Sequence, residues 1–208
     1  KGTYNIISQR QHLYLTGHNS NDANGTNIEV FQKNGQSGQE FKIEKPTDVE
    51  LEPEKTVEEG TYKIKMASNI SKVVTIDGEN TENGANVCLF EDKGLDSQEF
   101  NLSYDGDGYY EIISVNSGKR LDVCGWGNGT NVAQWSRNKV SDSQKWIIYV
   151  GDDGKYHIIS KRDNLYLTIH DSNSSDETNI EVYEKNNNSG QEFILEKLAN
   201  KSERTISD

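Results

Sequence analysis

The chain has 208 residues, of which only 32% are hydrophobic, and it carries a net charge of −12 at pH 7. A protein this acidic repels phosphate-coated partners, because affinity for nucleic acids comes from Lys and Arg displacing counterions. No apolar run approaches the roughly 18 to 20 residues that span a bilayer. We therefore expect no nucleic-acid partner and no membrane insertion, whereas neutral ligands remain possible.

Four copies of a Gln-x-aromatic triplet divide the chain into repeated units. The last three copies lie 46 and 47 residues apart, whereas the first step is 59 residues. The additional residues fall between 45 and 57, a segment with clustered acids and both prolines of the chain, which is typical of a linker. The triplets begin at Gln39, Gln98, Gln144 and Gln191.

The first unit closely matches the last one. Residues 4–45 align with residues 156–197 at a constant offset of 152, and 26 of 42 positions are identical, including LYLT, TNIEV and SGQEF. The first unit therefore corresponds to the last member of a set of three. We expect it to be the remaining lobe of an upstream set that has been truncated.

Each unit contains four short runs with the composition of β-strands. In the first unit these runs are YNIIS, LYLTG, TNIEVF and QEFKIE, each rich in β-branched or aromatic residues and bounded by turn residues. The pattern recurs in residues 60–104, 108–149 and 155–197, which are joined by the Asp-Gly turns YDGDG and VGDDG. The last three units thus predict twelve strands, and none of the runs requires a helix.

A single unit of this size cannot bury its own apolar face. We expect three units to close around a common axis, so that Ile64, Val74, Val87, Phe100 and their equivalents form one core. Closure also removes exposed strand edges. The predicted domains are an orphan lobe at 1–45, a linker at 46–57, a three-lobed domain at 58–197 and a polar tail at 198–208.

The third unit carries a recognisable set of motifs. It has the strand Leu121-Asp122-Val123, a Gly/Asn turn, a strand ending in Trp135 and the triplet Gln144-Lys145-Trp146. Together these resemble the ricin B-chain type β-trefoil lectins and carbohydrate-binding modules. The resemblance implies an all-β β-trefoil with pseudo-threefold symmetry, formed by three four-stranded lobes, plus one additional trefoil-like lobe.

The same resemblance implies a function. It is that of a noncatalytic carbohydrate-binding domain for glycans, with galactose-type sugars as the expected ligand. Such domains are often appended to a secreted toxin or glycosidase, so we expect a secreted, extracellular protein. The other units keep the general pattern but replace Trp by Phe in the triplet and Asp by Thr in the second strand.

Sugar binding in water requires an aromatic surface for the CH face of the ring and a carboxylate for its hydroxyls. The third unit supplies Asp122 and Trp135, thirteen residues apart on successive strands. The resemblance assigns the acid and the stacking ring to these positions. Trp126, in the loop GWGNG, is expected to wall the same pocket, because an exposed Trp is costly unless something covers it.

Further contacts in the third unit are less defined. Related domains often place an amide just before the triplet Gln, but Ser143 stands there. Asn138 or Gln134 is the alternative source of that contact. Gln144 belongs to the predicted site, although a triplet Gln is expected mainly to pair with backbone or neighbouring polar groups.

The other units lack an acid in the second strand and make weaker candidates. Thr16, Thr75 and Thr168 occupy that position. A second site in the fourth unit would use Asp171 with Tyr183. The least supported pairs are Asn19 with Phe31 in the first unit and Asp77 with Phe90 in the second.

Two alternative functions belong to other classes. Thr at three of four acid positions also fits a protein-interaction or assembly module with mostly lost sugar pockets. An enzyme is not expected, because the sequence has no Gly-rich phosphate loop, nucleophile elbow or H-E-x-x-H motif. His18 and His170 occupy equivalent positions without a second His or Cys at ligand spacing, so we expect neither a metal nor a cofactor.

Two further expectations concern the cysteines and assembly. Cys88 and Cys124 occupy non-equivalent positions and are predicted to be unpaired structural thiols. The apolar strands of the orphan lobe need cover, which the lobe can obtain beside the trefoil, from two other chains in a trimer, or by displacing the fourth unit. A homo-oligomer through the N-terminal lobe is therefore a possible partner arrangement.

Overall fold

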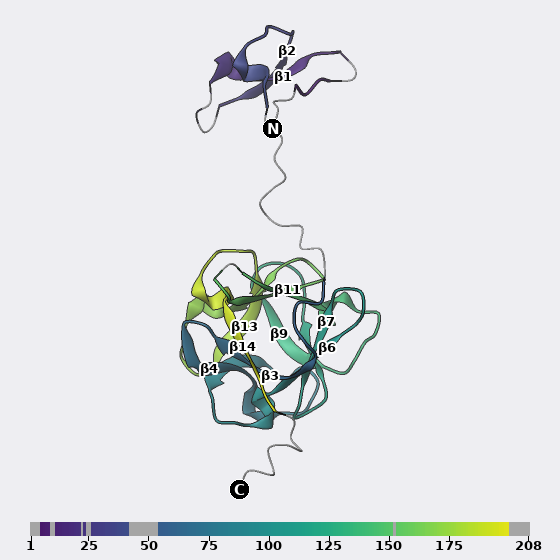
Figure 1. The fold of residues 1–208 in the computed structure, drawn as a ribbon, viewed down its shortest axis with the longest axis vertical. Helices are drawn as coiled ribbons and strands as arrows, with labels where there is room; N and C mark the ends of the chain where they lie inside the picture. The colour runs from purple at the N-terminus through teal and green to yellow at the C-terminus, as the bar shows by residue number, and fades with distance from the viewer. Residues whose placement is uncertain are drawn as a thin grey trace. The chain divides into compact units, whose positions relative to one another are not determined.

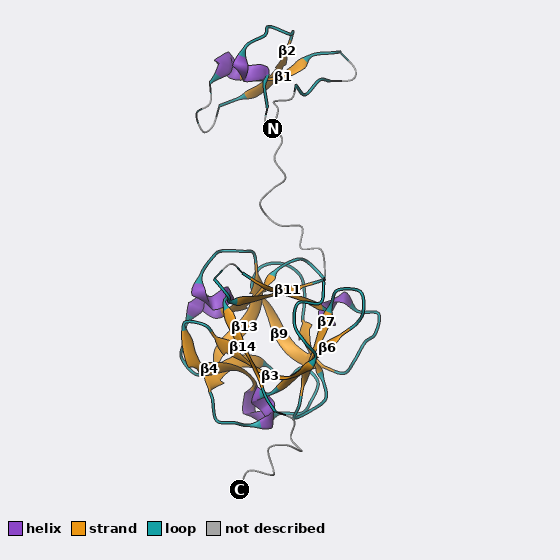
Figure 2. Cartoon of the chain, viewed as in Figure 1, coloured by secondary structure: helices purple, strands orange, loops and turns teal. Residues whose placement is uncertain are grey.

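The computed structural model describes residues 5–8, 11–21, 23, 26–41, 54–151 and 153–199. The chain folds as two compact units, Lys1–Glu50 and Leu51–Asp208. The described residues form β-strands and short 3-10 helices, and none of them forms an α-helix (Figures 1 and 2). No helix among these residues is long and apolar enough to cross a membrane. Most of the predicted linker, at 46–53, and the tail from residue 200 lie outside the described residues.

Six strands of the second unit form a closed barrel. Each strand pairs antiparallel with the next, and the last pairs with the first. This closure leaves no unpaired edge in the barrel, so no strand of the barrel offers free backbone groups for pairing with another chain. In ring order the strands are β3 (Gly60–Met66), β6 (Phe100–Tyr104), β7 (Tyr110–Ser114), β10 (Trp146–Val150), β11 (Tyr156–Ser160) and β14 (Phe193–Lys197).

Each lobe consists of two barrel strands and a hairpin that lies between them in the sequence. The hairpins are β4 (Asn69–Ile76) with β5 (Val87–Glu91), β8 (Arg120–Val123) with β9 (Thr130–Trp135), and β12 (Tyr166–Ile169) with β13 (Thr178–Tyr183). Strand β13 also pairs with β5 and β9, which brings the three hairpins together. The prediction of a β-trefoil with three four-stranded lobes is confirmed.

One core lies inside the barrel and beneath the hairpins. Ile64, Val74, Val87 and Phe100 are all fully buried in it, as predicted. Burial alternates along β3, because a strand turns every second side chain inward. A chain with few apolar residues can therefore still fill this core. The largest fully buried side chains are Trp146, Tyr110, Phe100 and Phe193.

The core extends beyond the predicted domain boundary. The predicted linker ends at Val57, but this residue is buried in the core cluster. Its backbone N–H donates to the Tyr110 hydroxyl at 2.7 Å, and its carbonyl accepts from the same hydroxyl at 2.8 Å. A buried Tyr needs a partner for its hydroxyl, so the trefoil includes Val57 and the boundary at residue 58 is set too late.

Two hydrogen bonds among three side-chain amides join the three lobes where their hairpins meet. Asn86 donates from Nδ2 to Asn179 Oδ1 at 3.0 Å, and Asn131 donates from Nδ2 to Asn86 Oδ1 at 2.9 Å. The three residues occupy equivalent positions near the start of the third strand of each lobe. Paired amides satisfy one another in this half-buried place and fix the contacts between the lobes.

The first unit has the same hairpin, but its apolar side chains are exposed. Strands β1 (Tyr14–Gly17) and β2 (Ile28–Phe31) pair in the register of β12 and β13. Ile28 is 54% exposed, whereas its counterpart Ile180 is 0% exposed and belongs to the core cluster, on the strand that pairs with β5 and β9 of the neighbouring lobes. The homo-oligomer through this lobe remains a prediction.

The cysteines differ from each other in burial. Both are unpaired. Cys88 is buried, and this burial raises the pKa of its thiol to about 12. Cys124 is exposed, in contrast to the buried position expected of a structural thiol.

Candidate carbohydrate-binding sites

The triplet glutamine of each lobe holds the residue at the acid position. In the third lobe Gln144 lies in η5 (Asp142–Gln144), where Nε2 donates to Asp122 Oδ2 at 2.7 Å and to the Ser136 carbonyl at 3.0 Å. Its Oε1 accepts the backbone N–H of Asn138 at 2.8 Å. Gln144 is buried, so its amide orients Asp122 instead of standing free for a ligand.

The sequence-predicted pair of the third lobe lies on one face of the hairpin. Asp122 pairs with Ala133, and Arg120 pairs with Trp135. Directly paired residues of antiparallel strands share a face, as do residues two apart on one strand. Asp122 and Trp135 are therefore diagonal neighbours on the same face, and Trp135 is 43% exposed.

Of the two alternative amide contacts, only Asn138 is accessible. Asn138 is exposed and follows the end of β9. Gln134 is fully buried, and its amide bonds to the carbonyls of Asn80 and Glu82 at 2.7 and 3.0 Å and to the Ser117 hydroxyl at 2.6 Å. The assignment of Gln134 to the sugar site is wrong, because Gln134 alternates with Trp135 along the strand and points the other way.

Trp126 contacts a cationic side chain of the fourth lobe. The Arg162 guanidinium lies 4.4 Å from the centre of its ring. Arg162 is in turn anchored by a bond from Nη1 to the Val123 carbonyl at 2.9 Å. Although Trp126 is exposed, this cation–π contact covers part of its ring.

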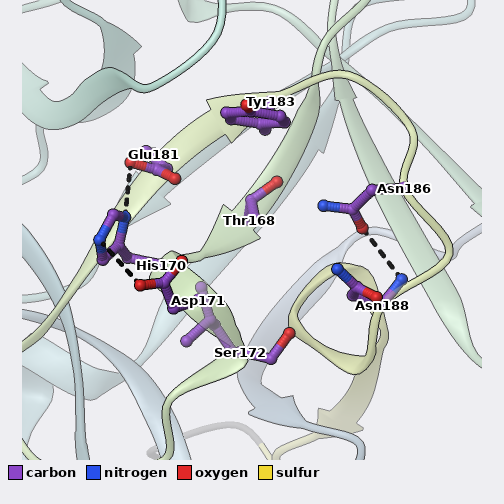
Figure 3. A pocket seen from close by; sticks show the side chains of 9 residues that line it. Thr168, His170, Asp171, Ser172, Glu181, Tyr183, Asn186 and Asn188 are labelled. Atoms are coloured by element: carbon purple, nitrogen blue, oxygen red, sulfur yellow. Dashed lines mark hydrogen bonds and ion pairs between the residues drawn. The ribbon is translucent and has the colours of Figure 1, made fainter.

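The fourth lobe contains a pocket of about 410 Å³. Figure 3 shows it with the predicted second-site residues Asp171 and Tyr183 among its walls. All of its lining residues come from one lobe and none from its neighbours. They are Thr168, Ile169, His170, Asp171, Ser172, Glu181, Tyr183, Asn186 and Asn188.

The acid of this pocket is on the other strand of the hairpin. Glu181 pairs with Thr168, in the place that Ala133 takes opposite Asp122 in the third lobe. Its side chain is only 10% exposed. Glu181 therefore supplies a carboxylate to the same face as Tyr183 (Figure 3).

Sequence reasoning missed Glu181, although a signal for it was present. It lies two residues before Tyr183, so the two side chains must share a face of the strand. The sequence motif points only to the position of Asp122 and to the turn that follows it. The acid of a site can therefore come from either strand of the hairpin, provided that its side chain lies on the same face as the aromatic ring.

His170 holds the carboxylate of Glu181. Its Nδ1 lies 3.1 Å from Glu181 Oε2, and its Nε2 lies 3.5 Å from Asp171 Oδ2. Asp171 is highly exposed and its side chain is directed at His170. Among the described residues, no group of three or more His, Cys, Asp or Glu side chains is arranged to hold a metal ion.

The His170–Glu181 contact has a testable electrostatic consequence. The hydrogen bond to Glu181, followed by the charges of Glu181 and Asp171, raises the pKa of His170 above its usual value. The protonated ring stabilises the fold below the usual His pKa of about 6.5, and this contribution is lost as the pH rises through the raised pKa. Glu181→Gln is expected to lower the His170 pKa toward its usual value.

An NMR pH titration of the His170 ring protons tests this prediction. His157, whose pKa is lowered mainly by burial, is the internal control and should keep its pKa in the variant. An unchanged His170 pKa in Glu181→Gln would show that the two side chains do not interact in solution. Because His170 is more than half exposed, the effect on stability itself is expected to be small.

The second lobe has no carboxylate at either of the two positions that supply the acid in the third and fourth lobes. Cys88 pairs with Thr75, so neither strand of this hairpin places a carboxylate at that point. The ring of Phe90 is covered by the Lys93 ammonium at 4.7 Å from its centre. The weaker prediction of a site at Asp77 and Phe90 therefore has little support in this geometry.

Comparisons with known proteins agree with the fold. A comparison with curated proteins gives no match. Among solved structures, the designed 3-fold symmetric protein ThreeFoil is 30% identical with a TM-score of 0.65, and the match covers 67% of this chain and 99% of ThreeFoil. A ricin B-like lectin from Macrolepiota procera, in complex with lactose, is 17% identical with a TM-score of 0.60 and covers 69% and 99% of the two chains.

A third structure is a larger enzyme. An exo-β-1,3-galactanase from Clostridium thermocellum is 23% identical with a TM-score of 0.63, and the match covers 89% of this chain but only 38% of the galactanase. The model of the ricin-type beta-trefoil lectin domain-like family matches residues 47–135 and 142–207. Because this match covers well over half of the sequence, the chain belongs to the ricin-type β-trefoil lectin-like family.

Proposed function

We propose that this chain is the noncatalytic glycan-binding part of a larger secreted protein, such as a toxin or glycosidase, and that it binds galactose-type sugars. The fourth-lobe pocket carries the proposal, because it combines a nearly buried carboxylate with an aromatic ring on one face. The third lobe supports it with Asp122 and Trp135. The lectin from Macrolepiota procera in complex with lactose supports the galactose-type ligand.

The pocket has complementary walls for a sugar ring. In Figure 3, Glu181 and His170 lie on one side and Asn186 and Asn188 on the other, with Thr168 between them and Tyr183 beside them. The Tyr183 ring offers an apolar surface to the CH face of a sugar. Glu181 accepts hydrogen bonds from hydroxyls, and a charged acceptor makes bonds roughly twice as strong as a neutral one.

The affinity of each site is expected to be low. A shallow pocket that holds one sugar typically reaches a Kd of about 1 mM, or about 4 kcal/mol. Several sites on one molecule then increase the binding to a surface that displays many copies of the glycan. The proposed function is therefore attachment to glycan-coated surfaces.

A site-resolved titration tests the proposal. Lactose added to the ¹⁵N-labelled full chain should shift the amide signals around Asp122 in the third lobe and around Glu181 in the fourth. Asp122→Asn should abolish the first set and Glu181→Gln the second, because each change removes the charge and keeps the shape. The matched control is Glu177→Gln, which removes an exposed charge outside the pocket.

The outcomes separate the two candidate functions. Loss of the shifts in each variant, with both retained in the control, supports a lectin. A wild-type chain that binds neither lactose nor any member of a glycan array would contradict the proposal. That result would favour the alternative of a protein-interaction module, for which the exposed apolar side chains of the first unit are the relevant observation.

A further inference from the structure

The first unit repeats the pocket of the fourth lobe residue by residue. At the offset of 152, five of the nine lining positions are identical. Two of the others keep the aromatic ring or the side-chain amide, because Phe31 replaces Tyr183 and Gln36 replaces Asn188. The identical residues of the first unit are Thr16, His18, Ser20, Glu29 and Asn34.

The contacts within this second set match those of the first. His18 Nδ1 lies 3.1 Å from Glu29 Oε1, as His170 does from Glu181. Gln39 donates from Nε2 to Thr16 Oγ1 at 3.1 Å and accepts the backbone N–H of Asn34 at 2.9 Å. In the fourth lobe Gln191 makes the corresponding bonds at 3.0 and 3.0 Å.

The strand register also places the side chains on one face. Thr16 pairs with Glu29, and Tyr14 pairs with Phe31. Glu29 and Phe31 are therefore neighbours on the face that Glu181 and Tyr183 use in the fourth lobe.

The lining of this pocket comes from a single lobe, although Glu181 also pairs with Asn131 of the third lobe. All nine lining residues of the fourth-lobe pocket fall between residues 168 and 188, within one lobe. The corresponding segment of the first unit is residues 16–36. The structure describes all of it except the loop residues 22, 24 and 25. A lobe with exposed apolar side chains can thus still present the polar face that binds a ligand.

We propose that the first unit carries an additional glycan-binding site of the same class as the fourth lobe, formed by Glu29, Phe31 and His18. The inference rests on the proposed function of the fourth lobe. The Glu29 side chain is 38% exposed, compared with 10% for Glu181, so water competes more strongly for it. The site in the first unit is therefore expected to bind a few times more weakly than that of the fourth lobe.

Two such sites on separate units have a further consequence. When linked sites bind one surface, the second binding step is intramolecular and takes place at a high effective concentration. Loss of the site in the first unit is expected to weaken binding to a dense lactose surface by about tenfold. The affinity of the fourth lobe for free lactose should stay unchanged.

The experiment uses the ¹⁵N-labelled full chain titrated with lactose. Amide signals of Gly17 and Glu29 report on the first unit, and those of Ile169 and Glu181 report on the fourth lobe. Glu29→Gln and Phe31→Ala should each abolish the lactose-induced shifts in the first unit only. The matched control is Glu40→Gln, an exposed acid of the same unit outside the pocket, which should retain the shifts.

The results separate this inference from the proposed function. Lactose shifts in both units, with loss of the first-unit shifts in Glu29→Gln and Phe31→Ala but not in Glu40→Gln, support the additional site. Saturation of the fourth lobe without any shift in the first unit overturns the additional site and leaves the proposed function intact. First-unit shifts that persist in both Glu29→Gln and Phe31→Ala have the same meaning. An absence of shifts in every lobe overturns both.

Discussion

Tyr183→Ala is expected to lower the affinity of the fourth lobe for lactose by about tenfold or more. The ring forms the apolar wall of the pocket beside Glu181. Burying an aromatic face against a sugar contributes on the order of 1.5 to 3 kcal/mol, and a loss of about 1.4 kcal/mol corresponds to a factor of ten in Kd. The measurement is the lactose dependence of the Ile169 amide shift in the full chain.

Two variants define what this result means. Tyr183→Phe should keep the affinity within about threefold, since it retains the ring and removes only the hydroxyl. Trp135→Ala should remove binding in the third lobe and leave the fourth lobe unchanged. An affinity that survives Tyr183→Ala would show that the ring is part of the scaffold and that the sugar does not stack on it.

Ile180→Ala is expected to destabilise the trefoil by about 2 to 5 kcal/mol. Ile180 is fully buried where β13 meets β5 and β9, and the smaller side chain leaves a cavity that the surrounding barrel cannot fill. Urea unfolding followed by Trp fluorescence measures the loss. All three tryptophans of the chain lie in the second unit, so their signal reports on the trefoil alone.

The first unit provides the matched control for this change. Ile28 is the counterpart of Ile180 but is largely exposed, so Ile28→Ala should change stability by less than about 0.5 kcal/mol. Unfolding of the first unit is followed by its amide NMR signals. A larger loss that grows with protein concentration would show that other copies cover Ile28, as the predicted homo-oligomer requires.

Most of the fold was predictable from the sequence because its information is local. The repeat spacing, the alternation of apolar residues and the turn residues indicate four lobes, twelve strands in the trefoil and the core that contains Ile64 and Phe100. The role of Gln144 as a hydrogen-bond partner for its own lobe was likewise expected. Such features depend on residues close in sequence or on a period that the chain repeats.

The candidate sites were only partly predictable. Asp122 and Trp135 were predicted from a familiar motif that places an acid and a ring on adjacent strands, and the two residues share one face of the hairpin. Asp171 and Tyr183 line one pocket. Gln134 was assigned wrongly and Glu181 was missed. Both errors come from following the motif position instead of the alternation along a strand, which places Gln134 on the face opposite to Trp135 and Glu181 on the face of Tyr183.

The sequence by itself determined that a chain poor in apolar residues folds as repeated β lobes, because alternation and repetition can be read without knowing which strands pair. Only the tertiary structure decided which side chains of paired strands share a face, that the His170 ring holds the carboxylate of Glu181, and that Val57 belongs to the core. These properties arise from strand register and from contacts between lobes, in which residues far apart in sequence, such as Asn86 and Asn179, satisfy or cover one another.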